Sequence, residues 1–271
     1  MTSRATEHER SPATATSSGV DEAELDRHVK QMYTDVATEP RGGYHFEVGR
    51  GIAERLGYDP RVLDQIPGAA VESFAGVGHH FDLAALGSGE RVLDLGSGSG
   101  TDSFVAAVAV GPSGRVDGID MTGAQLDKAE RLRAEAGRFE HVRFHEGRIE
   151  ELPFDEGSFD CVISNGVINL VADKQRVFDE AARVLRPGGR LALSDIVTRD
   201  HLPESVVCNA TLWAACIGGA MQREDYQRAI EAAGLSVEVV KPNDYRFLSG
   251  QAERAAGKFG VQSVSLLAVK P

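Results

Sequence analysis

The sequence predicts an α/β fold, with a doubly wound, mostly parallel seven-stranded sheet and a helical cap at the N-terminal end. From Arg91 onward, short apolar runs alternate with longer segments of helical period. The first run, Val92 to Leu95, ends in a turn of alternating glycines, Gly96 to Gly100, ahead of an apolar helical stretch. Clear turns at Gly111–Gly114 and Arg186–Gly189 separate later elements. Such alternation is typical of parallel strands joined by helices.

The elements follow in order along the chain. Strands are predicted near 91–95, 115–119, 142–146, 159–164, 190–196, 235–241 and 262–269. Helices are predicted near 21–38, 46–56, 102–110, 122–136, 173–186 and 222–233. No helix of clear period separates the last two strands, which favours an antiparallel final strand.

Composition shifts divide the chain into three parts. Residues 1–20 are rich in Ser, Thr, Ala and charge, so we expect a disordered tail. Residues 21–84 are too short for a core of their own and are expected to cap the main domain. Residues 85–271 form that domain, with a substrate-side insertion near 198–221.

Charge and cysteine content limit the possible partners. The net charge of -12 argues against nucleic acid as the main partner. The chain lacks an apolar stretch long enough for a membrane span and the apolar region of a secretory signal. Its three cysteines do not form a disulfide framework, so we expect a cytoplasmic protein, with the oligomeric state left open.

The glycine turn predicts a nucleotide site. Gly96, Gly98 and Gly100 follow a strand and precede a helix, where backbone approaches a bound nucleotide closely. A plain tight turn is the alternative interpretation. Asp120 ends the second strand, twenty residues after Gly100, and is predicted to bind ribose hydroxyls rather than to be only an exposed carboxylate.

Two later segments add candidates to the same site. Ile149 could flank a purine ring and Glu150 could face its amine, although a solvated charged loop is an equal alternative. Asn165 follows the fourth strand, and the carboxyl ends of parallel strands line the ligand crevice of such sheets.

These stretches resemble class I methyltransferases that use S-adenosylmethionine (SAM). The run Leu95-Gly-Ser-Gly-Ser-Gly100 differs from the G-x-G-x-x-G of dinucleotide enzymes. Later family motifs are similar to Glu151–Phe154, Phe159–Asp160 and Val184–Gly189, so the resemblance covers roughly residues 85 to 271. It implies a Rossmann-like methyltransferase fold and SAM as the cofactor. The residues that it places at the cofactor are Asp94, Gly96, Ser97, Gly98, Gly100, Asp120, Met121, Ile149, Glu150 and Asn165.

A narrower resemblance is to arsenite methyltransferases. It is carried by Val116–Thr122, Ile163–Leu170 and Leu193–Val197. That family holds trivalent arsenic with three cysteine thiolates, soft ligands for a soft metalloid. The third matches Cys216, whereas Val77 and Gly166 stand at the other two positions.

Few residues are candidates for chemistry at the acceptor. Cys216 could contact a thiophilic substrate together with Cys208, or both thiols could simply be buried. His79 and His80 lie in a glycine-loosened loop, where one could contact substrate or act as a base and the other could be a solvated loop residue. No resident metal site is predicted.

The leading interpretation is a SAM-dependent methyltransferase acting on a small, soft nucleophile, similar to the arsenite enzymes. The lost cysteines suggest a thiol such as methanethiol or sulfide as an alternative acceptor, and O-, N- or C-methylation of a natural product is another. A nicotinamide-dependent oxidoreductase is disfavoured by the glycine order. A non-catalytic SAM-binding protein is the remaining alternative.

Overall fold

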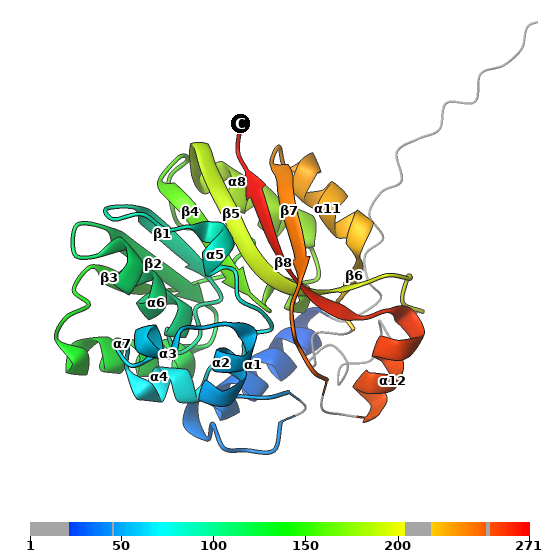
Figure 1. Ribbon diagram of the computed structural model, residues 1–271, viewed down its shortest axis with the longest axis horizontal. Helices are drawn as coiled ribbons and strands as arrows, with labels where there is room; N and C mark the ends of the chain where they lie inside the picture. The colour runs from blue at the N-terminus through cyan, green and yellow to red at the C-terminus, as the bar shows by residue number, and fades with distance from the viewer. Residues whose placement is uncertain (1–21, 45, 204–217, 248–249) are drawn as a thin grey trace, which may run out of the picture.

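The computed structural model describes residues 22–44, 46–203, 218–247 and 250–271, and their strands form one sheet (Figure 1). The order is β3-β2-β1-β4-β5-β8-β7, and the short β6 pairs with β5 beside this path. The strands are β1 Arg91–Leu95, β2 Arg115–Asp120, β3 Val142–Glu146, β4 Phe159–Asn165, β5 Leu185–Thr198, β6 Met221–Gln222, β7 Ser236–Pro242 and β8 Gln262–Val269. Only β8 among these runs antiparallel to its neighbours. The predicted doubly wound, mostly parallel sheet is therefore confirmed.

Helices cover both faces of the sheet because successive strand side chains point to opposite sides. In β1, Val92 packs with α6 (Thr101–Val110), while Leu93 and Leu95 pack on the other face with α8 (Lys174–Val184) and α11 (Arg223–Ala232). The helices that follow β2, β4 and β6 are α7 Gly123–Ala136, α8 Lys174–Val184 and α11 Arg223–Ala232. The short 3-10 helix η1 spans Ile168–Leu170, after β4. None of the described helices combines the length and apolar character needed to cross a bilayer.

The N-terminal helices lie mainly at the carboxyl ends of the parallel strands (Figure 1). They are α1 Glu22–Thr38, α2 Arg50–Leu56, α3 Pro60–Leu63, α4 Gly68–Glu72 and α5 Phe81–Ala84. The apolar side chains of α2 to α4 join the core around α6, and α1 packs along α7. This segment thus borders the end of the sheet where ligands bind in open α/β folds.

Hydrogen bonds between side chains and backbone attach α1 to the rest of the molecule. Gln125 Nε2 donates to the carbonyl of Tyr33 at 2.8 Å, and Lys128 Nζ donates to that of Ala37 at 2.9 Å. Ser73 Oγ donates to the carbonyl of Val36, also at 2.9 Å. All three bonds reach the C-terminal half of α1.

Three local expectations were incomplete. The helix α12, Gly250–Phe259, stands between β7 and β8, where no helix was predicted; the antiparallel last strand was predicted correctly. The helix expected near 46–56 begins only at Arg50. The turn at Arg186–Gly189 lies inside β5, which already begins at Leu185 and pairs with β4 through an irregular register.

Candidate functional site

A cavity opens at the carboxyl ends of β1, β2 and β4, beneath α1. It encloses about 970 Å³ of empty space, including its open mouth. Its lining combines the turn after β1, the end of β2, the segment after β3 and the inner face of α1. Nine of the ten predicted cofactor residues line it, namely Asp94, Gly96, Ser97, Gly98, Asp120, Met121, Ile149, Glu150 and Asn165. These nine residues come from four separate stretches of the chain, which the fold brings to one place.

Glycine is required in the turn after β1. Gly96 has a φ of 71°, and a Cβ on it would lie 2.3 Å from Val167 Cγ2. Gly98 has a φ of 52°, and its N–H donates to Asp120 Oδ2 at 2.9 Å. The hydroxyl of Ser97 is buried and has no protein partner, although it belongs to the cavity wall. A buried polar group of this kind is satisfied by a ligand or water.

Gly100 has a different role from the other two glycines. It is not part of the cavity wall, and its φ of 90° places it at the N-cap of α6. A Cβ there would lie 2.8 Å from ring atoms of both Phe104 and Phe144. Gly100 therefore allows α6 to pack closely on the sheet.

Asp120 is held in place by backbone donors. Its carboxylate accepts hydrogen bonds from the N–H groups of Gly98 and Thr122, at 2.9 and 2.8 Å. Burial raises the pKa of Asp120, and these bonds oppose the rise. Each carboxylate oxygen has a further lone pair available for a ligand hydroxyl.

Two more carboxyl groups lie deep in the cavity. Asp94 accepts a 2.6 Å hydrogen bond from Ser103 Oγ, and burial raises its pKa to about 8. Asp102, on the first turn of α6, accepts a 2.7 Å bond from the hydroxyl of Tyr58. Burial also raises the pKa of Asp102, to about 6, against the effect of its hydrogen bonds. Asp102 was not among the residues predicted for the site, although its place directly after the glycine turn was the available signal.

The segment after β3 meets α1 at the mouth of the cavity. Arg148 Nη1 lies 2.5 Å from Asp26 on α1, and Arg148 Nη2 lies 2.7 Å from Glu150. Ile149, which stands between Arg148 and Glu150 in the sequence, has a buried side chain. Glu150 is thus an ion-paired residue of the wall rather than a freely solvated loop carboxylate.

Helix α1 contributes Asp26, Val29 and Tyr33 to the cavity wall. Tyr33 was predicted from the sequence as an aromatic candidate for the pocket wall, with plain packing as the alternative. Asp26 and Val29 were missed, because a periodic apolar stripe predicts burial without saying what it is buried against. Gln125 on α7 also lines the cavity and was missed.

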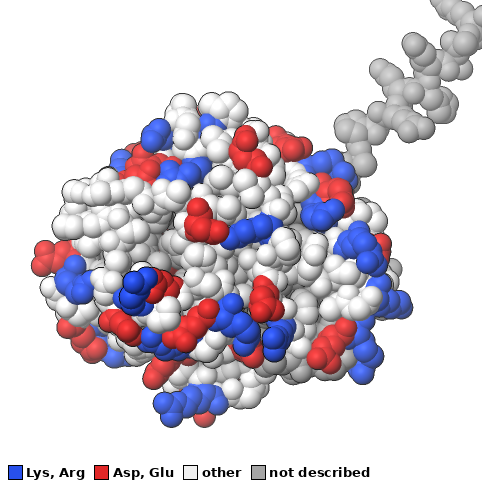
Figure 2. Space-filling view, viewed as in Figure 1, with Lys and Arg blue, Asp and Glu red and all other residues white. Residues whose placement is uncertain are grey.

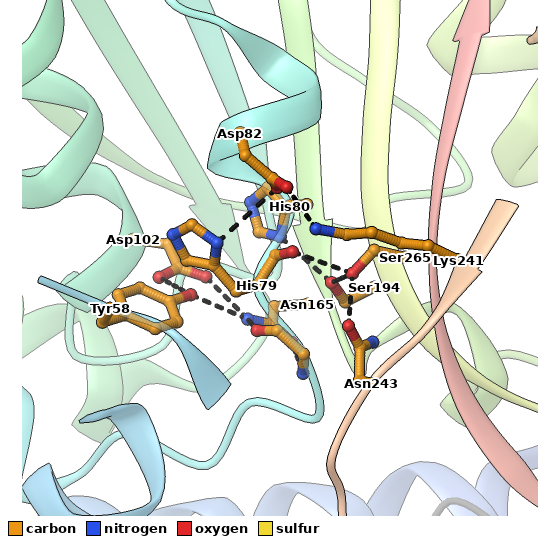
Figure 3. A network of polar contacts seen from close by, with 11 residues as sticks. Tyr58, His79, His80, Asp82, Asp102, Asn165, Ser194, Lys241, Asn243 and Ser265 are labelled. Atoms are coloured by element: carbon orange, nitrogen blue, oxygen red, sulfur yellow. Dashed lines mark hydrogen bonds and ion pairs between the residues drawn. The ribbon is translucent and has the colours of Figure 1, made fainter. Parts of the chain in front are cut away.

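Asn165, whose side chain lies beside Tyr58 and Asp102 in Figure 3, joins the end of β4 to the loop at 76–78. Its Oδ1 accepts the N–H groups of Val77 and Gly78, at 2.8 and 3.3 Å. A Cβ on Gly76 would lie 2.5 Å from Asn165 Nδ2, and one on Gly78 would lie 2.2 Å from Asn243 Nδ2. The expectation of a glycine-loosened loop was wrong, because these glycines allow close packing of a loop whose backbone is hydrogen-bonded at Val77 and Gly78.

His79 and His80 pack behind this loop, and neither lines the cavity. His80 is completely buried, with Nδ1 3.4 Å from Ser194 Oγ and no partner at Nε2. Burial lowers the pKa of His80 to about 3, so its imidazole is neutral at physiological pH. His79 Nδ1 lies 3.6 Å from Asp82, and burial lowers its pKa as well. Their position does not support the predicted chemical role.

The cysteine candidates cannot be located in the cavity. Cys208 and Cys216 lie outside the described residues. Val77 is buried, and a Cβ on Gly166 would lie 3.2 Å from Val77 Cγ1, so these two positions face each other beside the cavity. Cys161 is buried inside β4, and burial raises its pKa to about 12. Within the described ranges, His, Cys, Asp and Glu side chains form no group suited to a metal ion.

The chain resembles known methyltransferases in sequence. A family model described as a methyltransferase domain matches residues 86–234. An arsenite methyltransferase of Halobacterium salinarum is 40% identical over 222 residues, covering 81% of this chain and 56% of the relative. An arsenite methyltransferase of Mus musculus is 45% identical over 143 residues, covering 50% of this chain and 38% of the relative. The chain thus spans about half the length, or less, of these curated relatives.

Solved structures show the same fold. An arsenic(III) SAM methyltransferase from Chlamydomonas reinhardtii superposes with a TM-score of 0.60 at 32% identity, covering 82% of this chain and 73% of that one. A geranyl diphosphate methyltransferase with bound sinefungin gives a TM-score of 0.64 at 20% identity, covering 92% and 99%. The second likeness concerns the fold alone.

Proposed function

Because the chain belongs to the methyltransferase-domain family, as a class I SAM-dependent member, we propose that it methylates a small, soft nucleophile, with arsenite as the first candidate. The observation that carries the proposal is the cavity at the carboxyl ends of β1, β2 and β4, built around the glycine turn. The acceptor is inferred from relatives 40% and 45% identical, which are arsenite methyltransferases.

The residues of the cavity fit SAM. Close backbone approach at Gly96 and Gly98, and the unpartnered hydroxyl of Ser97, suit a ligand seated against the turn. Asp120 would hold the ribose hydroxyls. Met121 and Ile149 would flank the adenine, with Glu150 toward its amine, and Asp94 would face the methionyl end.

SAM supplies a methyl group already activated by a sulfonium leaving group. The chain must align the acceptor and exclude water. Val29, Phe74, Val167 and Leu170 give one part of the cavity an apolar wall. A soft nucleophile needs little help from a general base near its pKa, which agrees with the placement of His79 and His80 outside the wall.

Binding of arsenite would rest on fewer thiols than in the family that the chain resembles. Val77 fills the space next to Gly166, so these positions supply no sulfur ligand. Cys216 and Cys208 are the remaining candidates. The comparisons do not favour a thiol or a natural product as acceptor, yet both classes belong in the test.

Calorimetry tests the donor half of the proposal. We expect SAM to bind with one-to-one stoichiometry and NAD to give no heat of binding. The reverse result would support an oxidoreductase instead.

The acceptor half is tested by arsenite binding to the SAM complex. We expect Cys216→Ser to lose affinity for arsenite while it keeps wild-type affinity for SAM. Cys161→Ser is the matched control, because that thiol is buried in β4 and away from the cavity wall. Unchanged arsenite binding in Cys216→Ser would exclude Cys216 as an arsenic ligand, whereas no arsenite binding to the wild type would remove arsenite as the acceptor and leave the thiols to be tested.

A further inference from the structure

Asp102 occupies an unusual place in the cavity. It is the second residue of α6 and lines the wall directly after the glycine turn, with 7% of its surface exposed. Its two carboxylate oxygens are bonded separately: Tyr58 Oη donates to Oδ1 at 2.7 Å and Asn165 Nδ2 donates to Oδ2 at 3.0 Å (Figure 3). The side chain is therefore fixed in orientation before any ligand arrives.

Tyr58 supports this carboxylate from outside the cavity. It is 3% exposed and is not part of the wall. Its ring makes edge contacts with Phe74, 5.0 Å between centroids, and with His79, 4.8 Å. Asn165 Nδ2 also lies 3.0 Å from the Tyr58 hydroxyl, which closes a three-residue ring of hydrogen bonds. Tyr58 therefore acts on a ligand through Asp102, and Asn165, which is itself part of the wall, holds the same carboxylate.

Carboxyl groups outnumber cationic side chains in the described part of the cavity wall. The described wall carries five carboxyl groups, those of Asp26, Asp94, Asp102, Asp120 and Glu150. Arg148 is the one Lys or Arg side chain among the described wall residues, and it is already paired with Asp26 and Glu150. The 204–217 stretch contains neither lysine nor arginine. A carboxylate held rigidly without a protein cation is suited to a ligand cation.

We propose that Asp102 is a binding residue for the cationic methionyl end of SAM, and that Tyr58 and Asn165 are the positioning residues that hold its carboxylate. This inference rests on the function proposed above. Asp102 then complements Asp94, and the two acids distinguish the charged methionyl end from an uncharged one. Because Asn165 also holds the loop at 76–78, a donor bound to Asp102 is coupled to the wall beside Val77.

The protonation of Asp102 supports this role. Its pKa is raised to about 6, mainly by burial, while the hydrogen bonds from Tyr58 and Asn165 lower it. The groups that face it are Tyr58, which stays protonated, and Asp94, whose pKa is raised as well. A cation binds best to the ionised carboxyl, so affinity for SAM should rise with pH through the pKa of Asp102.

The test compares two ligands that share the adenosine group. SAM carries an ammonium group and a sulfonium group at its methionyl end, whereas 5′-methylthioadenosine carries neither. Dissociation constants are measured by calorimetry for the wild type, Asp102→Asn and the control Glu231→Gln, an exposed carboxyl on α11. We expect Asp102→Asn to lower the affinity for SAM about tenfold and to leave the affinity for methylthioadenosine unchanged. The control should change neither affinity.

Tyr58→Phe provides a second readout that does not alter the cavity wall. Without the hydroxyl, the ionised form of Asp102 loses one donor, so the pH dependence of SAM affinity should shift to higher pH than in the wild type. An equal loss of affinity for both ligands in Asp102→Asn, or no loss of affinity for SAM, would overturn the inference. An unshifted pH dependence of SAM affinity in Tyr58→Phe would also overturn it. If neither ligand binds the wild type, the proposed function itself fails.

Discussion

At the scale of single residues, the cavity depends on backbone positions that other residues cannot adopt without strain. Gly96 has a positive φ, and the methyl groups of Val167 fill the space that a Cβ on Gly96 would occupy. Val167 is itself a wall residue. One position therefore sets both the path of the turn and the shape of the cavity.

We predict that Gly96→Ala weakens both folding and SAM binding. The left-handed φ and the contact with Val167 should lower the free energy of unfolding by about 1–3 kcal/mol. Displacement of Val167 into the cavity should reduce SAM affinity by about tenfold or more. Urea unfolding and calorimetry measure the two effects.

Gly123→Ala is the matched control for that variant. Gly123 is the first residue of α7, its φ is not positive, and a Cβ on it would have no atom within 4 Å. Its unfolding free energy should stay constant or rise by about 0.4–1 kcal/mol. Equal losses in the two variants would contradict the role assigned to Gly96.

His80 gives a pH dependence with a definite sign. Its pKa is about 3 in the folded chain, well below the ordinary 6.5. As pH falls below 6.5 the unfolded chain takes up the proton first, so this group destabilises the folded state progressively down to about pH 3. His80→Asn lacks this penalty. Between pH 7.5 and pH 5, its free energy of unfolding should improve relative to the wild type by about 2 kcal/mol. Parallel urea-unfolding profiles for the two proteins would refute this.

At the scale of elements, α1 is attached unevenly over the cavity. Its C-terminal half is bonded through Tyr33, Val36 and Ala37 to α7 and Ser73. Toward its N-terminal end, α1 is attached by the ion pair between Asp26 and Arg148 at the cavity mouth. A helix held in this way can loosen at one end while the other stays fixed.

We therefore predict that SAM slows amide hydrogen exchange in α1. Protection should be largest between Asp26 and Tyr33, the part that lines the cavity. Arg148→Met should speed exchange there in the free protein, because it removes the ion pair with Asp26. Arg131→Met, which removes an exposed ion pair on α7, serves as control and should leave α1 unchanged. Exchange in α1 that is insensitive to SAM would exclude α1 as a covering element.

The sequence predicted the strands well because period and turn residues are local properties. The cofactor site between Gly96 and Asp120 could be predicted for the same reason, since the spacing of strand, glycine turn and acidic residue is a local pattern. By contrast, α12 has only ten residues and two of them are glycines, which are poor helix formers, so no helix was predicted there. Tyr58 and Asp26 act through contacts with residues more than 40 positions away, as in the Tyr58–Asp102 and Asp26–Arg148 pairs, and no local pattern predicts such contacts.

At the scale of the whole molecule, the negative charge is organised differently inside and outside. Figure 2 shows acidic and basic side chains intermixed over the face that it presents. The cavity wall, by contrast, carries five carboxyl groups and one paired arginine among its described residues. The cavity also lies where the strand order reverses between β1 and β4, the usual ligand position in such sheets.

The most direct test of this account is transfer of a labelled methyl group from SAM by the full chain, with arsenite, methanethiol and a phenol offered separately. We predict label on arsenic, with one S-adenosylhomocysteine formed per methyl transferred, and loss of transfer in Gly96→Ala. Label on the phenol alone, or no transfer to arsenite or the thiol while SAM is bound, would contradict the account.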